Sequence, residues 1–320
     1  AERHAQWRIQ DSELNALLQQ CVGKSAVSFD QIVKGADNEV YSAQMSSGDA
    51  CIIRILRCDR DDVPGGVAEE AWCLQACSKA GVPVPEVLGV GTVRDDERTY
   101  DAMVLSKLEG APLSDLLPHL SPQDRKRAWF QMGDALSRIH GVRTGGFYRL
   151  NPDGSWGFPD WEASCRDSYD SRSKEKPFIS QAGFSDDDID FAFEIISRYR
   201  DTFSCTQPVL CHGDFGPGHV FFDPSLTLTG VIDFGMYQGD HPIHDFAEIS
   251  MDQDGSIPDG LLEGYGRVID DRLELRLHFH LVAYLIGYLA YHIQIPNHPE
   301  TPGLILELRK TLDWLKVRGS

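Results

Sequence analysis

The spacing of apolar residues changes along the chain, and this change constrains the fold more than any other feature. Two β-rich runs, residues 39–45 and 50–56, are separated by a short turn-forming segment and predict a β-hairpin. Further strand-like runs follow at 87–93 and 100–105. Later residues follow a mostly helical pattern. The chain is therefore expected to be an α+β protein with a small β-rich first lobe and a larger, mostly helical second lobe.

Helical spacing places the expected helices and divides the chain. The predicted helices are one within 7–21 capped by Asp11 and Ser12, one over 67–80 that ends at Gly81, one near 121–140, one after Ser185, and several in the C-terminal third. The segment 145–160 looks irregular. These elements predict an N-terminal lobe over residues 1–105, a hinge at 106–112 and a helical lobe over 113–320.

The charge of the chain limits its partners. The sequence holds 49 acidic residues against 30 Lys and Arg residues, a formal net charge of -19. Nucleic acid is excluded as the main ligand, because that binding depends on Lys and Arg displacing counterions from phosphates. A small cationic molecule would be attracted to such a surface instead.

Other whole-chain features indicate location and assembly. The most apolar stretch, residues 281–291, is shorter than the roughly 20 residues that cross a bilayer, so we expect a buried helix and no membrane partner. The 8 cysteines form no C-x-x-C pair, and we expect reduced thiols. The charged start of the chain lacks the apolar core of a signal peptide, which predicts a cytoplasmic protein. Monomer and homodimer both stay open.

Three polar residues are expected to meet in one glycine-rich segment. A turn folds the strand-like runs 220–222 and 226–232 into a hairpin. His219 and Asp233 flank these runs and therefore lie near the same end. Asp214 lies five residues before His219, on a loop where glycines leave room for a ligand. Phosphoryl transfer needs a metal at the phosphate oxygens, a positioned acceptor hydroxyl and neutralised charge, and this segment offers candidates for each.

This segment resembles the core of the aminoglycoside phosphotransferase family, on His212-Gly213-Asp214, the residue five positions later and Asp233-Phe234-Gly235. The resemblance implies a protein-kinase-like fold, ATP as the phosphoryl donor and a small-molecule hydroxyl as the acceptor. It implies that Asp214 orients the hydroxyl and accepts its proton, while His219 and Asp233 bind Mg²⁺. His219 stands where the family usually has Asn, and macrolide phosphotransferases with a similar Pro-Gly-His run share the histidine. Magnesium prefers oxygen donors, so a different metal preference is expected.

The resemblance also implies a nucleotide site. Its residues, from the phosphate-covering loop to the hinge, are Asp37, Asn38, Arg54, Glu70, Ser106 and Leu108. Arg54 stands where the family places a strand-borne Lys that contacts phosphates, and Glu70 is expected to be its ion-pair partner. The carbonyl of Ser106 and the N–H of Leu108 match the positions that bind adenine.

The resemblance places the acceptor site in the helical lobe, between the insert before the catalytic loop and the last helices. The candidates here are Asp160, Trp161, Glu162 and Asp240. Carboxylates can pair with ammonium groups, and an indole face can stack on a sugar ring or a cation. Asp245 resembles the structural aspartate that holds the metal loop.

The acceptor itself stays open. An aminoglycoside-like antibiotic is favoured, because the helical lobe is acidic and amines need carboxylate partners. The alternatives are a macrolide kinase, suggested by the Pro-Gly run before His219, and an endogenous kinase of an amino alcohol, sugar or similar metabolite, since this fold hosts many acceptors. A non-catalytic ATP-binding regulatory protein is a further alternative, motivated by His219 itself.

Overall fold

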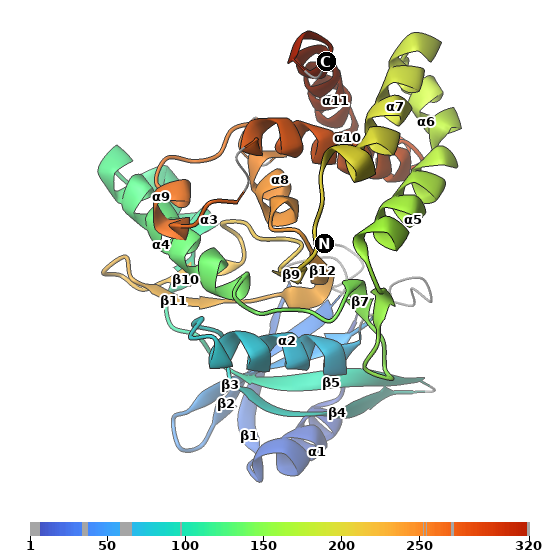
Figure 1. Cartoon of the computed structure of the whole chain (residues 1–320). Helices are drawn as coiled ribbons and strands as arrows, with labels where there is room; N and C mark the ends of the chain where they lie inside the picture. Colours follow the sequence, from blue (N-terminus) through green and yellow to red (C-terminus); the bar gives the residue numbers. More distant parts are fainter. Residues whose placement is uncertain are drawn as a thin grey trace.

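The computed structural model describes residues 7–33, 38–57, 66–96, 98–251, 253, 255–269 and 272–318. Its N-terminal third forms a twisted antiparallel sheet, at the bottom of Figure 1, and the helices of the C-terminal part lie above it. The predicted α+β class, with a β-rich first part and a helical second part, is confirmed.

Five strands form the N-terminal sheet in the order β1-β2-β3-β5-β4, and every neighbouring pair is antiparallel. Their bounds are β1 Ala26–Ile32, β2 Asn38–Met45, β3 Ala50–Leu56, β4 Val87–Asp95 and β5 Arg98–Ser106. The predicted hairpin and the two later strands are confirmed. β1 was not predicted from the sequence. It lies at the edge of the sheet, where its residues are exposed or only partly buried and Val27 is 68% exposed, so its sequence shows no regular alternation of apolar and polar residues.

Two helices cover opposite faces of this sheet. Helix α1 (Asp11–Val22) packs on β4, where Gly89 lies too close to Cys21 for any side chain. Along β3, side chains alternate between the two faces of the sheet. Ile53 packs in the core that contains α1, whereas Ile52 packs against the core that α2 (Val67–Lys79) shares with the C-terminal part. This arrangement places α2 between the sheet and the helical part (Figure 1).

The ends of these helices correct one prediction and confirm another. Residue Gln10 precedes α1, and its side chain makes no capping hydrogen bond, so the expected cap by Asp11 and Ser12 is wrong; both are already helical. The expected end of α2 is confirmed, because the chain turns at Gly81 with a φ of 79° that glycine adopts without strain.

Short strands form two small sheets in the C-terminal part. One has the order β11-β10-β6, from β11 Leu228–Val231, β10 Val220–Phe222 and β6 Ala111–Pro112; the other has the order β8-β7-β12-β9, from β8 Trp156–Phe158, β7 Phe147–Leu150, β12 Gln238–Asp240 and β9 Val209–Cys211. The predicted hairpin of β10 and β11 is confirmed. The segment expected to be irregular contains β7 and β8, which are too short to show a two-residue period.

Helices form the rest of the C-terminal part. They are α3 Leu113–Leu116, η2 Leu117–His119, α4 Pro122–Ile139, α5 Trp161–Ser173, α6 Lys176–Gln181, α7 Asp186–Thr202, η3 Phe234–Met236, α8 Ile243–Met251, α9 Leu261–Tyr265, α10 Leu273–His292 and α11 Thr301–Arg318. The Ser185 cap of α7 is confirmed, since its hydroxyl accepts the N–H of Asp188. Across the described ranges, none of the helices combines the length and apolar character needed to span a bilayer.

Candidate active site

Asp214 lies on the loop after β9, at the junction of the N-terminal sheet and the helices. The loop passes so close to the carbonyl of Met236 that Gly213, at a φ of 77°, has no space for a Cβ atom. The Asp214 side chain is 50% exposed, and one carboxylate oxygen lies 3.7 Å from Nδ1 of His219. The expected meeting of Asp214 with His219 is therefore present in the structure.

Asp245, at the start of α8, holds this loop in place through hydrogen bonds to its backbone. Its fully buried carboxylate accepts hydrogen bonds from the backbone N–H groups of His212 and Gly213, at 2.9 and 2.7 Å, and lies 2.9 Å from Nε2 of His140. Burial alone would raise the pKa of Asp245, but the His140 hydrogen bond and the nearby imidazoles lower it to about 2. Asp245 is therefore ionised, and Nε2 of His140 must be the donor.

His219 and Asp233 face each other across a gap that suits a cation. Nδ1 of His219 lies 2.9 Å from the backbone oxygen of Asp214, which can only accept, so Nδ1 carries the proton. In the neutral ring, Nε2 then keeps its lone pair, and it lies 3.8 Å from Oδ2 of Asp233. Metal bonds of about 2.0–2.1 Å to nitrogen and oxygen can span this gap. The two side chains fit the implied metal.

Arg54 of β3 connects this pair to α2. Its guanidinium forms an ion pair with Glu70 of α2, as expected, and a second with Asp233 Oδ1 at 2.8 Å. The neighbouring acid, Glu69, accepts the N–H of Gly66 at the start of α2. Burial raises the pKa of Asp233, but electrostatic attraction, led by the Arg54 guanidinium, outweighs burial and holds this pKa below its usual range.

Where the structure describes them, the other predicted nucleotide residues belong to strands of the N-terminal sheet or to the segment that follows β5. With its amide oxygen turned toward Arg54, Asn38 accepts hydrogen bonds from Nε and Nη2 at 3.1 and 2.7 Å. Asp37 lies outside the described residues. Ser106 ends β5, and Leu108 lies over Gly230 of β11, so the chain crosses from one part to the other here. Their contacts with adenine stay predictions.

All four predicted acceptor residues have structural partners within the protein, and three of them lie at the start of α5. Asp160 caps α5 by accepting the N–H of Ala163 at 2.8 Å, and Glu162 forms an ion pair with Arg166 at 2.7 Å. The indole of Trp161 donates to the carbonyl of Phe203 at 3.2 Å. These contacts explain the residues without a ligand, and their roles in acceptor binding stay predictions.

Asp240 differs from the other predicted acceptor residues because its side chain is only 16% exposed. Burial raises the pKa of its carboxyl group. Gln238 and His244 lie against this carboxylate, with distances of 3.1 Å from the Gln238 amide and 3.8 Å from the His244 imidazole. Asp240 is thus part of a polar cluster that follows the turn of Asp233 in the chain.

Arg149 of β7 was not predicted from the sequence as a residue of the site. Its side chain is buried, its Nη1 donates to the carbonyl of Gly235 at 2.8 Å, and its guanidinium lies 5.0 Å from the Tyr237 ring centre. Burial lowers its pKa. Arg149 therefore holds the turn that follows Asp233, and no local pattern around residue 149 signals this contact.

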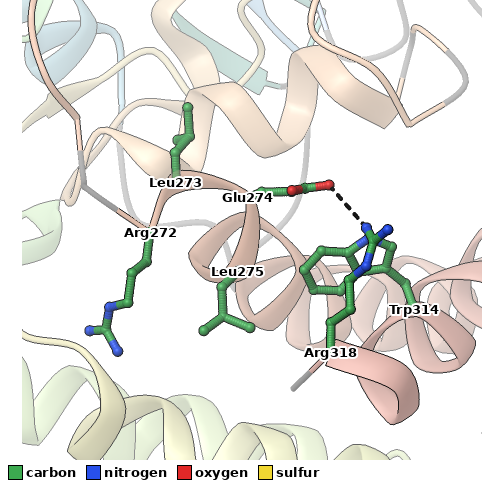
Figure 2. Close-up of a pocket in the computed structure, with 6 residues that line it drawn as sticks. All are labelled: Arg272, Leu273, Glu274, Leu275, Trp314 and Arg318. Carbon is green, nitrogen blue, oxygen red and sulfur yellow. Dashed lines mark ion pairs between the residues drawn. The ribbon is translucent and has the colours of Figure 1, made fainter. Parts of the chain in front are cut away.

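A surface cavity of about 450 Å³ lies elsewhere, between the start of α10 and the end of α11. Figure 2 shows its lining, with Arg318 reaching over Trp314 toward Glu274. None of the predicted site residues lines it. This cavity is therefore separate from the cluster around Asp214.

Solved structures show which fold this is. A thermostable mutant of aminoglycoside phosphotransferase APH(4)-Ia, in complex with ADP and hygromycin B, superposes with a TM-score of 0.69 at 18% identity, over 94% of this chain and 98% of that chain. A putative fructosamine-3-kinase from Thermobifida fusca gives 0.65 at 16% identity, over 95% and 99%. A macrolide 2'-phosphotransferase type I gives 0.56 at 20% identity, over 94% and 99%. The expected kinase-like fold is confirmed.

A family model identifies the chain more specifically. No curated protein matches the chain. The model described as "Phosphotransferase enzyme family" matches residues 28–278, which include nearly all of the N-terminal sheet, the loop of Asp214 and most of the helical part. The match covers well over half of the chain, and we conclude that this protein is an enzyme of the phosphotransferase enzyme family.

Proposed function

We propose that this chain transfers the γ-phosphate of ATP to a hydroxyl group of a small molecule. One observation carries the proposal: Asp214, His219 and Asp233 converge within 3.7–3.8 Å contacts, and Arg54 joins them from the N-terminal sheet. An acceptor, a metal and nucleotide phosphates could thus meet at one point. The neighbours crystallised with ADP or AMP-PNP support ATP as the donor.

Asp214 is proposed to orient the acceptor hydroxyl and to take its proton. Its half-exposed carboxylate can receive a hydrogen bond from an incoming alcohol. An Asp carboxylate with a pKa of ~3.9 is a weak base toward an alcohol, so orientation precedes a late proton transfer. The nucleophile would then be the hydroxyl oxygen, and the bond that breaks would be the one between the γ-phosphorus and the β–γ bridging oxygen of ATP.

His219 and Asp233 are proposed to hold Mg²⁺. When bound, the ion would neutralise charge on the β- and γ-phosphates. Arg54 adds a second positive charge, and Glu70 keeps the guanidinium directed toward Asp233. The nucleotide phosphates would compete with Asp233 for Arg54, so binding should loosen the Arg54–Asp233 contact.

The acceptor class is proposed to be an aminoglycoside-like polyamine. The acidic surface, with a net charge of -19, supports this choice because it attracts cations. The hygromycin B complex of a structural neighbour is consistent with it. Macrolides and small sugar or amino-alcohol metabolites are the competing classes, since the neighbours include a macrolide 2'-phosphotransferase and a putative fructosamine-3-kinase.

An acceptor screen tests this proposal. ADP release is measured with Mg²⁺ and ATP over panels of aminoglycosides, macrolides and small hydroxylated metabolites. We expect acceptor-dependent ADP release that is strongest in the aminoglycoside panel. ADP release only with a macrolide or a metabolite would show that the acceptor belongs to that class and is not an aminoglycoside. Nucleotide binding without any acceptor-dependent release would instead favour the regulatory protein.

Replacement of His219 by Asn should shift the metal preference toward Mg²⁺. The imidazole Nε2 is a better ligand for Mn²⁺ than for Mg²⁺, whereas the Asn amide supplies the oxygen that Mg²⁺ prefers. We expect the ratio of Mg²⁺ to Mn²⁺ affinity to rise by about tenfold, or about 1.4 kcal/mol. Electron paramagnetic resonance of bound Mn²⁺, displaced by Mg²⁺ with ADP present, measures the ratio. His119→Asn, at an exposed position of η2, is the control. An unchanged ratio of Mg²⁺ to Mn²⁺ affinity would show that His219 is not a metal ligand.

A further inference from the structure

We propose that Asp240, His244 and His280 form a second metal site, selective for Zn²⁺. The three residues come from β12, α8 and α10, and α8 lies between the other two elements (Figure 1). Their ligand atoms all lie within 4.8 Å of one another. None of these residues belongs to the proposed catalytic metal pair.

The distances suit tetrahedral coordination. Nδ1 of His244 lies 3.2 Å from Nε2 of His280 and 3.8 Å from Oδ2 of Asp240. Ligands that are about 2.0–2.2 Å from Zn²⁺ are about 3.4 Å apart at tetrahedral angles. The two observed distances lie on either side of that value. Small side-chain movements would therefore bring all three donors onto one ion.

Neighbouring groups hold the donors in place. The hydroxyl of Tyr199 lies 3.4 Å from Nδ1 of His280, which leaves Nε2 directed at His244. Zinc-binding histidines commonly have such a partner on the second ring nitrogen. The side-chain amide of Gln238 lies 2.9 Å from His244 Nδ1 and 3.1 Å from Asp240 Oδ2. Rotation of this amide would offer its oxygen as a fourth ligand.

The neutral imidazoles and the types of donor atom in this cluster favour Zn²⁺ over Mg²⁺. Burial lowers the pKa of both His244 and His280, and neighbouring positive groups, including Arg276 beside His280, add to the effect on that ring. Both imidazoles are therefore neutral at neutral pH, as metal ligation requires. Two nitrogens and one carboxylate are a donor set for Zn²⁺, whereas Mg²⁺ requires mostly oxygen.

A bound ion would join three parts of the helical region. β12 and α8 directly follow the turn of Asp233, and α10 is the long helix on which α5, α7 and α8 pack. Zn²⁺ would tie the segment after the metal loop to α10. The proposal does not depend on phosphoryl transfer, because the ion and its ligands can be measured in the absence of nucleotide.

Zn²⁺ binding to the full chain tests the proposal. Protein freed of metal by a chelator is titrated with Zn²⁺ by calorimetry and then dialysed for metal analysis. We expect about one tightly bound equivalent at this site, and His280→Gln should weaken it by more than about 100-fold, because loss of an outer partner alone costs about 10–100-fold. Wild-type protein that binds no Zn²⁺, or His280→Gln protein that binds it unchanged, would overturn the proposal.

Two control variants separate this site from other histidines. His219→Asn alters the proposed catalytic pair, and His298→Gln alters a cluster with His292 and Glu300 at the end of α10. Both should keep the tight Zn²⁺ equivalent, and its loss in either one would overturn the assignment. Wild-type protein loaded with Co²⁺ gives a readout that needs no variant: a strong visible band of tetrahedral Co²⁺ is expected, and a weak octahedral spectrum would contradict the site.

Discussion

Replacement of Asp214 by Asn should lower kcat by about 100- to 10,000-fold, the usual contribution of a positioned acid or base. The amide cannot take the proton of the acceptor hydroxyl. Its size and its backbone are the same, so the hydrogen bond from His219 to the carbonyl of residue 214 should remain. The Kd for ATP is expected to change little, because Arg54 and Asp233 are untouched.

Initial rates of ADP release and calorimetric ATP titration measure these two quantities for the Asp214 variant. Asp201→Asn is a matched control, because Asp201 is an exposed residue at the end of α7, paired with Arg200. It should keep the wild-type rate. Full turnover by the Asp214 variant would show that another group receives the proton.

Replacement of Asp245 by Asn should destabilise the protein by about 3–5 kcal/mol, the usual cost of breaking a buried ion pair or hydrogen-bonded charge. The carboxylate accepts from His212, Gly213 and His140 with both of its oxygens, whereas an amide would direct N–H groups at one of these donors. Activity should also fall, since Gly213 directly precedes Asp214. Urea unfolding at neutral pH, followed by circular dichroism, measures the change.

The pH dependence gives a second measurement on Asp245. Its pKa is about 2 in the folded protein and ~3.9 in an unfolded chain, so the ionised group stabilises the fold above pH ~4. This stabilisation should be lost as the pH falls from about 4 to about 2. The Asp245→Asn variant should lack that part of the pH dependence. Equal acid sensitivity of both proteins would show that the buried carboxylate is not the responsible group.

Local patterns in the sequence predicted the elements that organise the site. The hairpin of β2 and β3 places Arg54 opposite α2, and the hairpin of β10 and β11 brings His219 to Asp233. Both depend on alternating apolar residues around a turn. The pairing of Arg54 with Glu70 was predicted from the family resemblance. The two residues are 16 positions apart in the chain, so no local pattern connects them.

Elements at the surface could not be predicted from periodicity. Helix α5 has no buried residue, so its sequence lacks the apolar stripe that marks a helix. Strands β1, β7 and β8 lie at sheet edges or are very short. Their formation depends on neighbours that are distant in the chain.

The contacts that support the site could not be predicted from the sequence either. His140 and Asp245 are 105 positions apart, and Arg149 reaches Gly235 across 86 positions. Hydrogen bonds of this kind follow from tertiary packing and leave no local motif. The same reason explains why the cluster of Asp240, His244 and His280 was not predicted, although Asp240 alone was singled out.

The proposed reaction transfers a phosphoryl group from ATP to a small-molecule hydroxyl at Asp214. Mass spectrometry of an acceptor incubated with ATP labelled with ¹⁸O in the γ-phosphate measures this transfer most directly. We expect an acceptor that gains one labelled phosphoryl group for each ADP formed, with almost no product from Asp214→Asn protein. Labelled inorganic phosphate as the sole product, or equal labelling of the acceptor by the Asp214 variant, would contradict it.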